Sequence, residues 1–401
     1  QMYKLESVYK GFVRSGALLS SENKEILKKI SNDLSIESLK FSQNLLAETN
    51  ASYIVIEKPE DLAGLSEGII SMGADKAKEL KQEGKWIFTT QRSSFTPFMQ
   101  FAENRALREA LFRAYTMRGD RDNENDNKAV FQKILSLKGE MARLLGYESP
   151  AHFYLETRMA KTPQTVDEFL LKLWSPALNR SKAELSEMQQ IADRENPGTK
   201  LEPWDWWFYA EKLRKEKYDL DDNVLRPYFS LEAVKQGIFY LCHQLYSIQF
   251  KPCPKAEKYH PDIEVYEVLE KNGTHIGLLY MDFFFRSSKR DGAWSGGFRS
   301  SYIEQGKRIT PHSTIVCNFT PPTGDQPSLL SLDEAGTFFH EFGHALNSLF
   351  STGVFKNRNV PRDSVELPSQ IMEHWAFEPV MLKQYAKHYK TGMIIPDDLI
   401  N

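Results

Sequence analysis

Apolar side chains recur at three- and four-residue steps through much of the first 50 residues, with charged and amide side chains between them. Such spacing gathers the apolar residues on one face of a helix, and it predicts one long helix in this region. The pattern returns over roughly 128–145, where Gly146 is placed to end the helix, and over 163–218, where Asn196-Pro197-Gly198 interrupts it. The apolar positions of the first pattern are Ile26, Leu27, Ile30, Leu34, Phe41 and Leu45.

Strand-like sequence is confined to about 262–320. The Asn272-Gly273 pair between the first two candidate strands is typical of a tight hairpin turn. Helical periodicity returns after Ser331. The candidate strands are Ile263–Leu269, His275–Phe285 and Thr314–Thr320. The chain is therefore predicted to be a mainly α protein, with one small sheet inserted before the helix that follows Ser331.

Composition narrows the function without identifying it. The 401 residues, 41% apolar and 26% charged, are enough for one large or two modest domains. The formal net charge is −3 and both signs are mixed along the chain, so neither nucleic acid nor an anionic membrane is expected as a partner. No run of 18 apolar residues is present, and we expect no membrane span. Three scattered cysteines do not make a disulfide framework.

The N-terminal residues, Gln1-Met2-Tyr3-Lys4, lack the apolar core of a signal peptide. A glutamine before Met2 is not typical of a native start, so we expect the natural chain to begin further upstream. A targeting segment would then lie outside this sequence. We expect a cytoplasmic protein, with the periplasm as the alternative.

Residues 119–127, GDRDNENDN, alternate acidic and amide side chains in a manner that a calcium loop also uses. However, the sixth position counted from Asp120 is Asn125 rather than glycine, and the twelfth is Phe131 rather than glutamate. The pattern therefore favours a solvated loop over a calcium site.

The clearest chemical signal lies in residues 331–350, SLDEAGTFFHEFGHALNSLF. Ser331 and Glu334 have the spacing of a capping box, which predicts that a helix starts there. His340 and His344 are four residues apart, so their imidazoles lie about one turn apart on one helix face and can bind one zinc ion. Glu341 lies beside them, where a carboxylate can take a proton from a zinc-bound water. The alternative is a helix whose histidines only cap or pack.

A catalytic zinc ion usually has three protein ligands and one open position. A third histidine six residues after His344 is excluded, because that position is Phe350. Glu366 is the better candidate, since 26 residues after His340 leave room for one helix to end and a second to return antiparallel. Pro368 restricts the start of that second helix to this neighbourhood. The alternative is that Glu366 is an ordinary acid of a first helical turn.

Ligating histidines normally donate their other N–H group to a carboxylate or a carbonyl. Asp363 and Glu373 are the nearest candidate acceptors, and Glu373 lies two turns after Glu366 on the same helix face. The alternatives are a helix cap for Asp363 and a surface acid for Glu373.

At this point the sequence resembles a known family. HEFGHAL at 340–346, together with VPRDSVELPSQIMEHW at 360–375, resembles the thimet oligopeptidase family of zinc peptidases, peptidase family M3. Similar stretches are HPDIEVYEV at 260–268, HIGLLYMDFFFRSSKRDGAW at 275–294 and CNFTPP at 317–322. Within the family, EHWAFEP at 373–379 and YAKHYKTG at 385–392 look most like the bacterial peptidyl-dipeptidase branch.

The resemblance implies a largely helical, two-lobed molecule with a deep channel that admits only short peptides. It implies one Zn2+ per chain, held by His340, His344 and Glu366, with Glu341 as general base. The small sheet would lie along the channel, and an edge strand there could pair with peptide backbone. We expect Thr314–Thr320 to be that edge strand and GAWSGG at 292–297 to be a mobile loop near the site.

The resemblance also implies a division into a helical region, 1–105, and a catalytic region, 106–401, that is incomplete at its C-terminus. The histidine and tyrosines with which the family stabilises its reaction intermediate would lie beyond residue 401, so the chain by itself is expected to be poorly active. We expect a monomer that releases C-terminal dipeptides from short peptides. The alternatives are an endo-acting oligopeptidase of the same family and a non-catalytic peptide-binding module.

Overall fold

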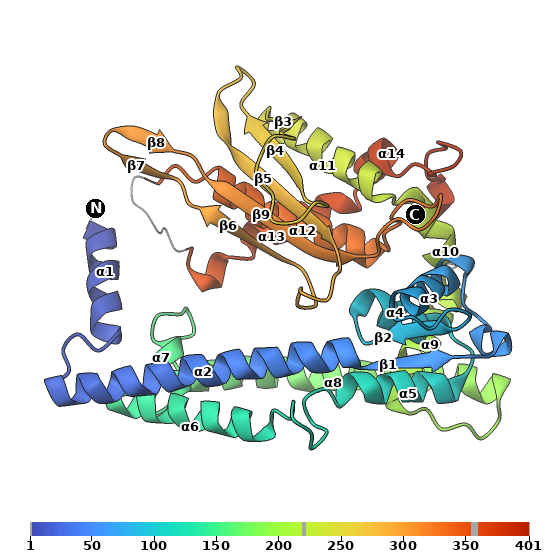
Figure 1. Cartoon of the computed structure of the whole chain (residues 1–401), viewed down its shortest axis with the longest axis horizontal. Coiled ribbons are helices and arrows are strands. Elements are labelled where there is room, and N and C mark those ends of the chain that lie inside the picture. The colour runs from blue at the N-terminus through green and yellow to red at the C-terminus, as the bar shows by residue number, and fades with distance from the viewer. Residues whose placement is uncertain (1, 219–221, 354–359, 401) are drawn as a thin grey trace. The chain divides into compact units, whose positions relative to one another are not determined.

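The computed structural model describes residues 2–218, 222–353 and 360–400, and it is mainly helical with small sheets, as the sequence pattern predicts (Figure 1). The chain divides into two compact units, which are described separately: Gln1–Ile54 with Glu109–Lys200, and Val55–Arg108 with Leu201–Asn401. The boundary predicted at residue 105 separates a helical region from a catalytic region. Compact units do not show where a function lies, so this boundary stays a prediction. No helix among the described residues is long and apolar enough to cross a bilayer.

The first unit is built from helices. The single helix predicted for the first 50 residues is wrong, because residues 15–20 separate two helices. Gly16 has a φ of +87°, a left-handed conformation that ends a helix, and the Ser20 side chain caps the next helix by accepting from the backbone of Asn23. The helices are α1 (Met2–Arg14), α2 (Ser21–Ala51), α5 (Arg105–Thr116, most of it here), α6 (Lys128–Leu144), α7 (Pro150–Leu155) and α8 (Pro163–Glu195).

The acidic loop before α6 contains its own cation. The ammonium group of Lys128 lies 2.6 Å from Asp120, 3.1 Å from Asp122 and 2.5 Å from Asp126. This lysine belongs to the same part of the chain and already compensates the charge of the three carboxylates. The structure therefore agrees with the interpretation of 119–127 as a solvated loop.

The second unit contains a five-stranded sheet in the order β3-β4-β5-β9-β6. β4 and β5 are antiparallel and are joined through Asn272-Gly273, as predicted, with Gly273 at a φ of +85°. β5 runs parallel to β9, and β6 runs antiparallel to β9. The strands are β3 (Gln249–Pro252), β4 (Glu264–Leu269), β5 (His275–Phe284), β6 (Trp294–Arg299) and β9 (His312–Phe319).

The expectation that strands are confined to about 262–320 is wrong. β3 lies before this region, and β1 (Tyr53–Ile56) pairs with β2 (Trp86–Thr89) far upstream. Each of these strands has four residues, which is too short for an alternating pattern to stand out. A further hairpin joins β7 (Tyr302–Glu304) and β8 (Lys307–Ile309).

The predicted edge strand is also wrong, for a related reason. β9, expected as the edge, is paired on both sides by β5 and β6 and is buried along most of its length. The edge is β6, which contains most of the glycine-rich stretch that was expected to be a mobile loop. Gly297 is needed there because a Cβ atom would lie 2.7 Å from the backbone oxygen of His312 on β9. Glycine therefore indicates close backbone approach in this strand.

The main core of the second unit lies between the sheet and helices that pack against it. Phe338 and Phe342 on α12 (Leu332–Leu349) are fully buried, and the Phe338 ring lies 5.1 Å from that of Phe283 on β5. Each buried phenylalanine stabilises the fold by roughly 1.5–3 kcal/mol. The core thus fixes which face of α12 points away from the sheet. Its other helices are α11 (Leu231–Tyr246), α13 (Leu367–Ala376) and α14 (Pro379–Tyr385).

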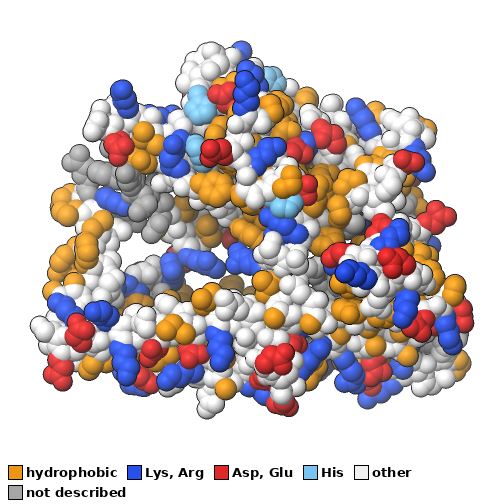
Figure 2. Space-filling model, viewed as in Figure 1, with side chains coloured by type: hydrophobic (Ala, Val, Ile, Leu, Met, Phe, Trp, Pro, Cys, Tyr) orange, Lys and Arg blue, Asp and Glu red, His pale blue; other side chains and the backbone are white. Residues whose placement is uncertain are grey.

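The same unit includes α3 (Glu67–Glu79), α4 (Arg92–Phe101), α9 (Trp206–Tyr218) and α10 (Asp222–Leu225). Acidic and basic side chains lie interspersed on the face shown in Figure 2, as the mixed charge of the sequence indicates.

The start of α12 gives a testable link between sequence and fold. The Ser331 hydroxyl accepts from the Glu334 backbone at 3.1 Å, and the Glu334 carboxylate accepts from the Ser331 backbone at 2.8 Å. Ser331→Ala removes one half of this capping box, so we expect the free energy of unfolding to fall by about 1 kcal/mol in denaturant titrations. Ser331→Asp, which keeps an acceptor, is the control and should stay close to the wild type. Equal stability of the alanine variant would contradict the assigned cap.

Candidate metal centre

The two histidines of α12 project from the face opposite its apolar side. Phe338, Phe342 and Ala345 are buried against the core, whereas His340 and His344 are only partly buried. The histidine ring centroids lie 5.0 Å apart at an interplanar angle of 82°. The i and i+4 spacing predicted from the sequence therefore brings both imidazoles to one place.

Glu366 completes a compact group with these histidines. It occupies the residue before α13, and its Oε2 atom lies 3.2 Å from Nε2 of His340 and 3.1 Å from Nε2 of His344. One ligand atom from each of the three residues lies within 4.8 Å of the other two. Ser369 holds the carboxylate in place, because its hydroxyl donates to Oε2 at 3.0 Å. The structure thus brings together the three residues that the sequence singled out.

The approach of the second helix depends on a glycine. A Cβ atom added to Gly343 would lie 2.5 Å from the backbone oxygen of Pro368 and 2.6 Å from the Cα atom of Ser369. Both are backbone atoms, so α13 could not give way locally and would have to move as a whole. The space beside Gly343 is therefore what allows Glu366 to reach the histidines.

Glu373 lies on the outer side of the group. One of its carboxylate oxygens is 3.1 Å from Nδ1 of His340, which leaves Nε2 of the same ring facing Glu366. A carboxylate in this position favours the tautomer that carries its proton on Nδ1. Asp363, the other predicted acceptor, lies exposed in the 3-10 turn η4 (Arg362–Ser364), and its contact with a histidine stays a prediction.

Glu341 differs from its neighbours in its burial. Its side chain is 6% exposed, and the backbone N–H of Ser295 on β6 lies close enough to its carboxylate to interact with it. Its Oε2 atom is buried without a hydrogen-bond partner among the described residues. With His340, Glu373, Thr337 and Ala293, it lines a cavity of about 590 Å³. Burial, followed by the negative charge of Glu366, raises the pKa of Glu341.

The surroundings favour the protonation states that metal ligands need. Burial lowers the pKa of His344, which keeps its imidazole neutral near pH 7. For Glu366 burial acts in the opposite direction, but the Ser369 hydrogen bond and the two histidines together hold its pKa below the usual range. A neutral imidazole and an ionised carboxylate both carry a free lone pair for a cation.

The group fits a divalent transition metal by the chemistry of its donors. Two imidazole nitrogens and one carboxylate oxygen are a ligand set found in catalytic zinc sites. Glu373 orients His340, and Ser369 orients Glu366. The buried oxygen of Glu341 without a partner lies beside them and fits a proton acceptor that a water molecule or a substrate would meet.

Three contributors to this site were not predicted from the sequence. Gly343 could have been suspected, since a glycine inside a helix needs a packing reason. Ser369 follows Pro368 and has the position of an ordinary first-turn serine. Ser295 lies in the segment that was expected to be a loop, so nothing in the sequence pattern linked it to Glu341.

Comparison with known proteins gives a consistent set of matches. A model of peptidase family M3 matches residues 98–401. Dipeptidyl carboxypeptidase of Escherichia coli (strain K12) is 37% identical over 401 residues, covering 98% of this chain and 58% of the relative. Oligopeptidase A of Salmonella typhimurium is 34% identical and saccharolysin of Saccharomyces cerevisiae is 31% identical. They cover 100% and 99% of this chain, and 60% and 57% of the relatives. The chain thus spans about three fifths of the length of these relatives.

The packing at Gly343 gives a prediction. Gly343→Ala should push α13 away from α12 and weaken zinc binding by about 10–100-fold, the effect expected when a group that orients metal ligands is disturbed. Competition with a chelating dye measures the affinity.

Gly336→Ala on the same helix is the matched control. Its Cβ atom would lie 3.3 Å from the Phe377 ring, which is a side chain and can move. We expect little change in zinc affinity for this variant. Equal affinities in the two variants would show that the close approach at Gly343 does not position Glu366.

Proposed function

Because this chain belongs to peptidase family M3, we propose that it is the catalytic part of a zinc-dependent peptidase that hydrolyses short peptides. The observation that carries the proposal is the convergence of His340, His344 and Glu366 within 4.8 Å, with Glu341 buried next to them. The expected monomeric state and cytoplasmic location stay predictions.

Zinc would be held by Nε2 of both histidines and by the carboxylate of Glu366. When bound, it supplies Lewis-acid chemistry, which polarises a carbonyl oxygen and makes water a stronger acid. Glu373 accepts a hydrogen bond from Nδ1 of His340 and so keeps the Nε2 lone pair directed toward the site. Ser369 orients Glu366 in a similar way, because its hydroxyl donates a hydrogen bond to Oε2 of the carboxylate.

Glu341 is the proposed general base. Its buried carboxylate takes a proton from the attacking water and later passes it to the departing amine. Burial raises the pKa of Glu341, which makes it a stronger proton acceptor than an exposed glutamate. The Ser295 N–H group lies close to the carboxylate, and the side chain of Glu341 lines the cavity in which the water would bind.

Edge strand β6 is the proposed docking site for the peptide backbone. One side of β6 pairs with β9, and no other strand pairs with its second side among the described residues. An extended peptide can add to such an edge through main-chain hydrogen bonds, which accept many different side chains. Because Ser295 of this strand contacts Glu341, a peptide lying along β6 would pass beside the general base.

The names of the relatives leave the type of cleavage open, since both a dipeptidyl carboxypeptidase and oligopeptidase A are among them. We favour release of C-terminal dipeptides, with internal cleavage as the alternative.

Glu341→Gln tests the assigned base in the full-length enzyme. The variant should keep one zinc ion per chain and lose about 10²–10⁴-fold in turnover of a quenched short peptide, because an amide cannot take the proton. Glu270→Gln, at an exposed position of the β4–β5 hairpin, is the matched control and should be fully active. Wild-type activity in the Glu341 variant would refute the assignment. A wild-type enzyme that binds zinc but cleaves no peptide would favour the peptide-binding module instead.

The type of cleavage follows from product masses. An unblocked octapeptide should lose two residues at a time from its C-terminus, in a ladder that mass spectrometry resolves. Blocking the C-terminal carboxylate as an amide should slow this ladder. Fragments produced by one internal cut, unaffected by the block, would instead support an endo-acting oligopeptidase.

A further inference from the structure

We propose that the buried Lys289 is a positioning residue for hydrolysis: it fixes the β5–β6 connection, residues 285–293, so that β6 and the Ser295 N–H group meet Glu341. The proposal rests on the proposed function as far as catalysis is concerned. Its structural part, the anchoring of β6, does not.

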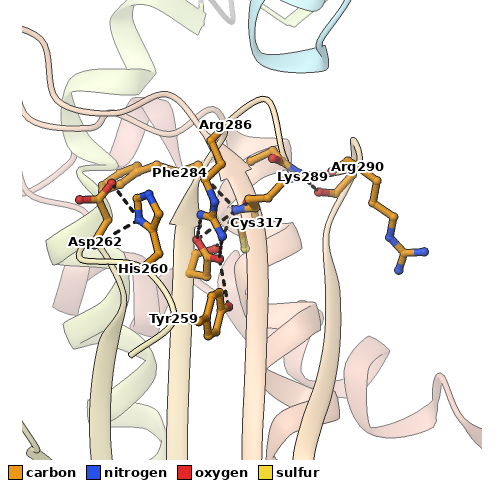
Figure 3. A network of polar contacts seen from close by, with 11 residues as sticks. Tyr259, His260, Asp262, Phe284, Arg286, Lys289, Arg290 and Cys317 are labelled. Atoms are coloured by element: carbon orange, nitrogen blue, oxygen red, sulfur yellow. Dashed lines mark hydrogen bonds and ion pairs between the residues drawn. The ribbon is translucent and has the colours of Figure 1, made fainter. Parts of the chain in front are cut away.

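Lys289 belongs to a buried polar network at the end of β5. Figure 3 shows Arg286, Lys289 and Tyr259 converging on one carboxylate. The hydrogen bonds identify it as the carboxylate of Asp282. Asp282 is 1% exposed and Lys289 is 7% exposed. Arg286 donates two hydrogen bonds of 2.7 Å to this carboxylate, and the Tyr259 hydroxyl donates one of 3.0 Å. The negative charge of Asp282 is therefore compensated by Arg286 even without the lysine.

The ammonium group of Lys289 has a second set of partners, which are backbone oxygens. It donates to the carbonyls of Asp282 at 3.3 Å, Phe284 at 2.7 Å and Cys317. Asp282 and Phe284 lie at the end of β5, and Cys317 lies near the end of β9. Since these strands are parallel, their carboxyl ends lie together, and one side chain from the following connection can bind both.

The register explains why a charged group is used at this place. The pairing of β5 with β9 shifts between Asp282 and Phe284, so the regular ladder is interrupted there. Buried carbonyls at an interrupted ladder need other donors, because an unsatisfied buried acceptor is costly. A lysine has three donors on one atom and can serve several carbonyls at once. An apolar side chain of the same size would leave them without these hydrogen bonds.

The side chain of Asn318 on β9 holds the next part of the connection. The side-chain amide of Asn318 donates to the carbonyls of Arg290 at 3.0 Å and of Gly292 at 2.6 Å. Ala293 then lines the catalytic cavity, and the Ser295 hydroxyl donates to the backbone of Thr314 on β9 at 3.0 Å. The connection is thus fastened at short intervals from Lys289 to Ser295. These successive hydrogen bonds together set the position of Ser295 beside Glu341.

The competing explanation is that Lys289 only stabilises the sheet. Lys235 allows the two explanations to be separated, because it is another buried lysine in the same unit, 3% exposed. Its ammonium group lies 2.6 Å from Glu232 on α11 and 2.7 Å from Glu264 on β4, a strand separated from β6 by β5 and β9. Removing Lys235 should therefore cost stability without acting on β6.

The experiment compares Lys289→Met with Lys235→Met in the full-length enzyme. We expect both variants to melt at a lower temperature than the wild type and both to keep one zinc ion. Only Lys289→Met should lose about 10²-fold in kcat, the size of effect that a displacement of about 1 Å can produce. KM should rise in the same variant, since β6 also holds the peptide.

Hydrogen exchange gives a readout that does not depend on activity. The amides of 290–297 should exchange faster in Lys289→Met and stay as in the wild type in Lys235→Met. Asn318→Ala, at a partly exposed position, is the second variant should Lys289→Met fail to fold, and it should speed exchange of the same segment.

The outcomes separate this inference from the proposed function. If Lys289→Met and Lys235→Met match in kcat at similar stability, and the exchange of 290–297 is unchanged, Lys289 has only a structural role and the inference is overturned. If exchange speeds up in a protein that never cleaves peptides, the anchoring is supported and the peptidase proposal fails. Where Asn318→Ala is the variant used, unchanged exchange and unchanged kcat also overturn the inference.

Discussion

The candidate metal centre depends on one close contact, the approach of α13 to α12 at Gly343. The helices bring backbone atoms so near to this residue that even a methyl group would not fit. Because Glu366 precedes α13 directly, any increase in the helix separation moves its carboxylate away from both imidazoles. The HExxH spacing therefore supplies two donors on one helix, while a glycine between the two histidines decides whether the third donor can reach them.

A second constraint acts from the sheet. α12 packs with its phenylalanines on the sheet and presents its histidines on the opposite side, so its rotation is set by core packing. Glu341 lies between these two faces, and for this reason it is buried yet reaches the cavity. The Ser295 N–H group that interacts with it belongs to β6, a strand whose own position depends on the hydrogen bonds that Lys289 and Asn318 make to the preceding connection. The candidate metal ligands and the proposed general base are thus positioned by different parts of the second unit.

The sequence predicted those features that one residue type at one spacing can encode. Ser331 and Glu334 give the start of α12, His340 and His344 give two imidazoles that lie together, and Asn272-Gly273 gives the hairpin. It failed where structure depends on a distant partner. β6 is held by pairing with β9, and Gly297, which indicates a loop when read locally, is required by close backbone contact. For the same reason the sequence could not show that Ser295 contacts Glu341, or which strand forms the edge.

Glu341 also differs from the other buried charged residues in its hydrogen bonding, independently of the motif. In the second unit the buried charged groups of Asp205, Lys235, Asp282 and Lys289 all have charged partners within hydrogen-bond distance. Among the described carboxylates of that unit, Glu341 alone has a buried oxygen without a hydrogen-bond partner. Such an oxygen costs stability of about 1–3 kcal/mol. A cost that the fold does not recover in packing is expected where a reacting molecule supplies the missing partner, so this unpaired oxygen points to Glu341 even before its neighbours are considered.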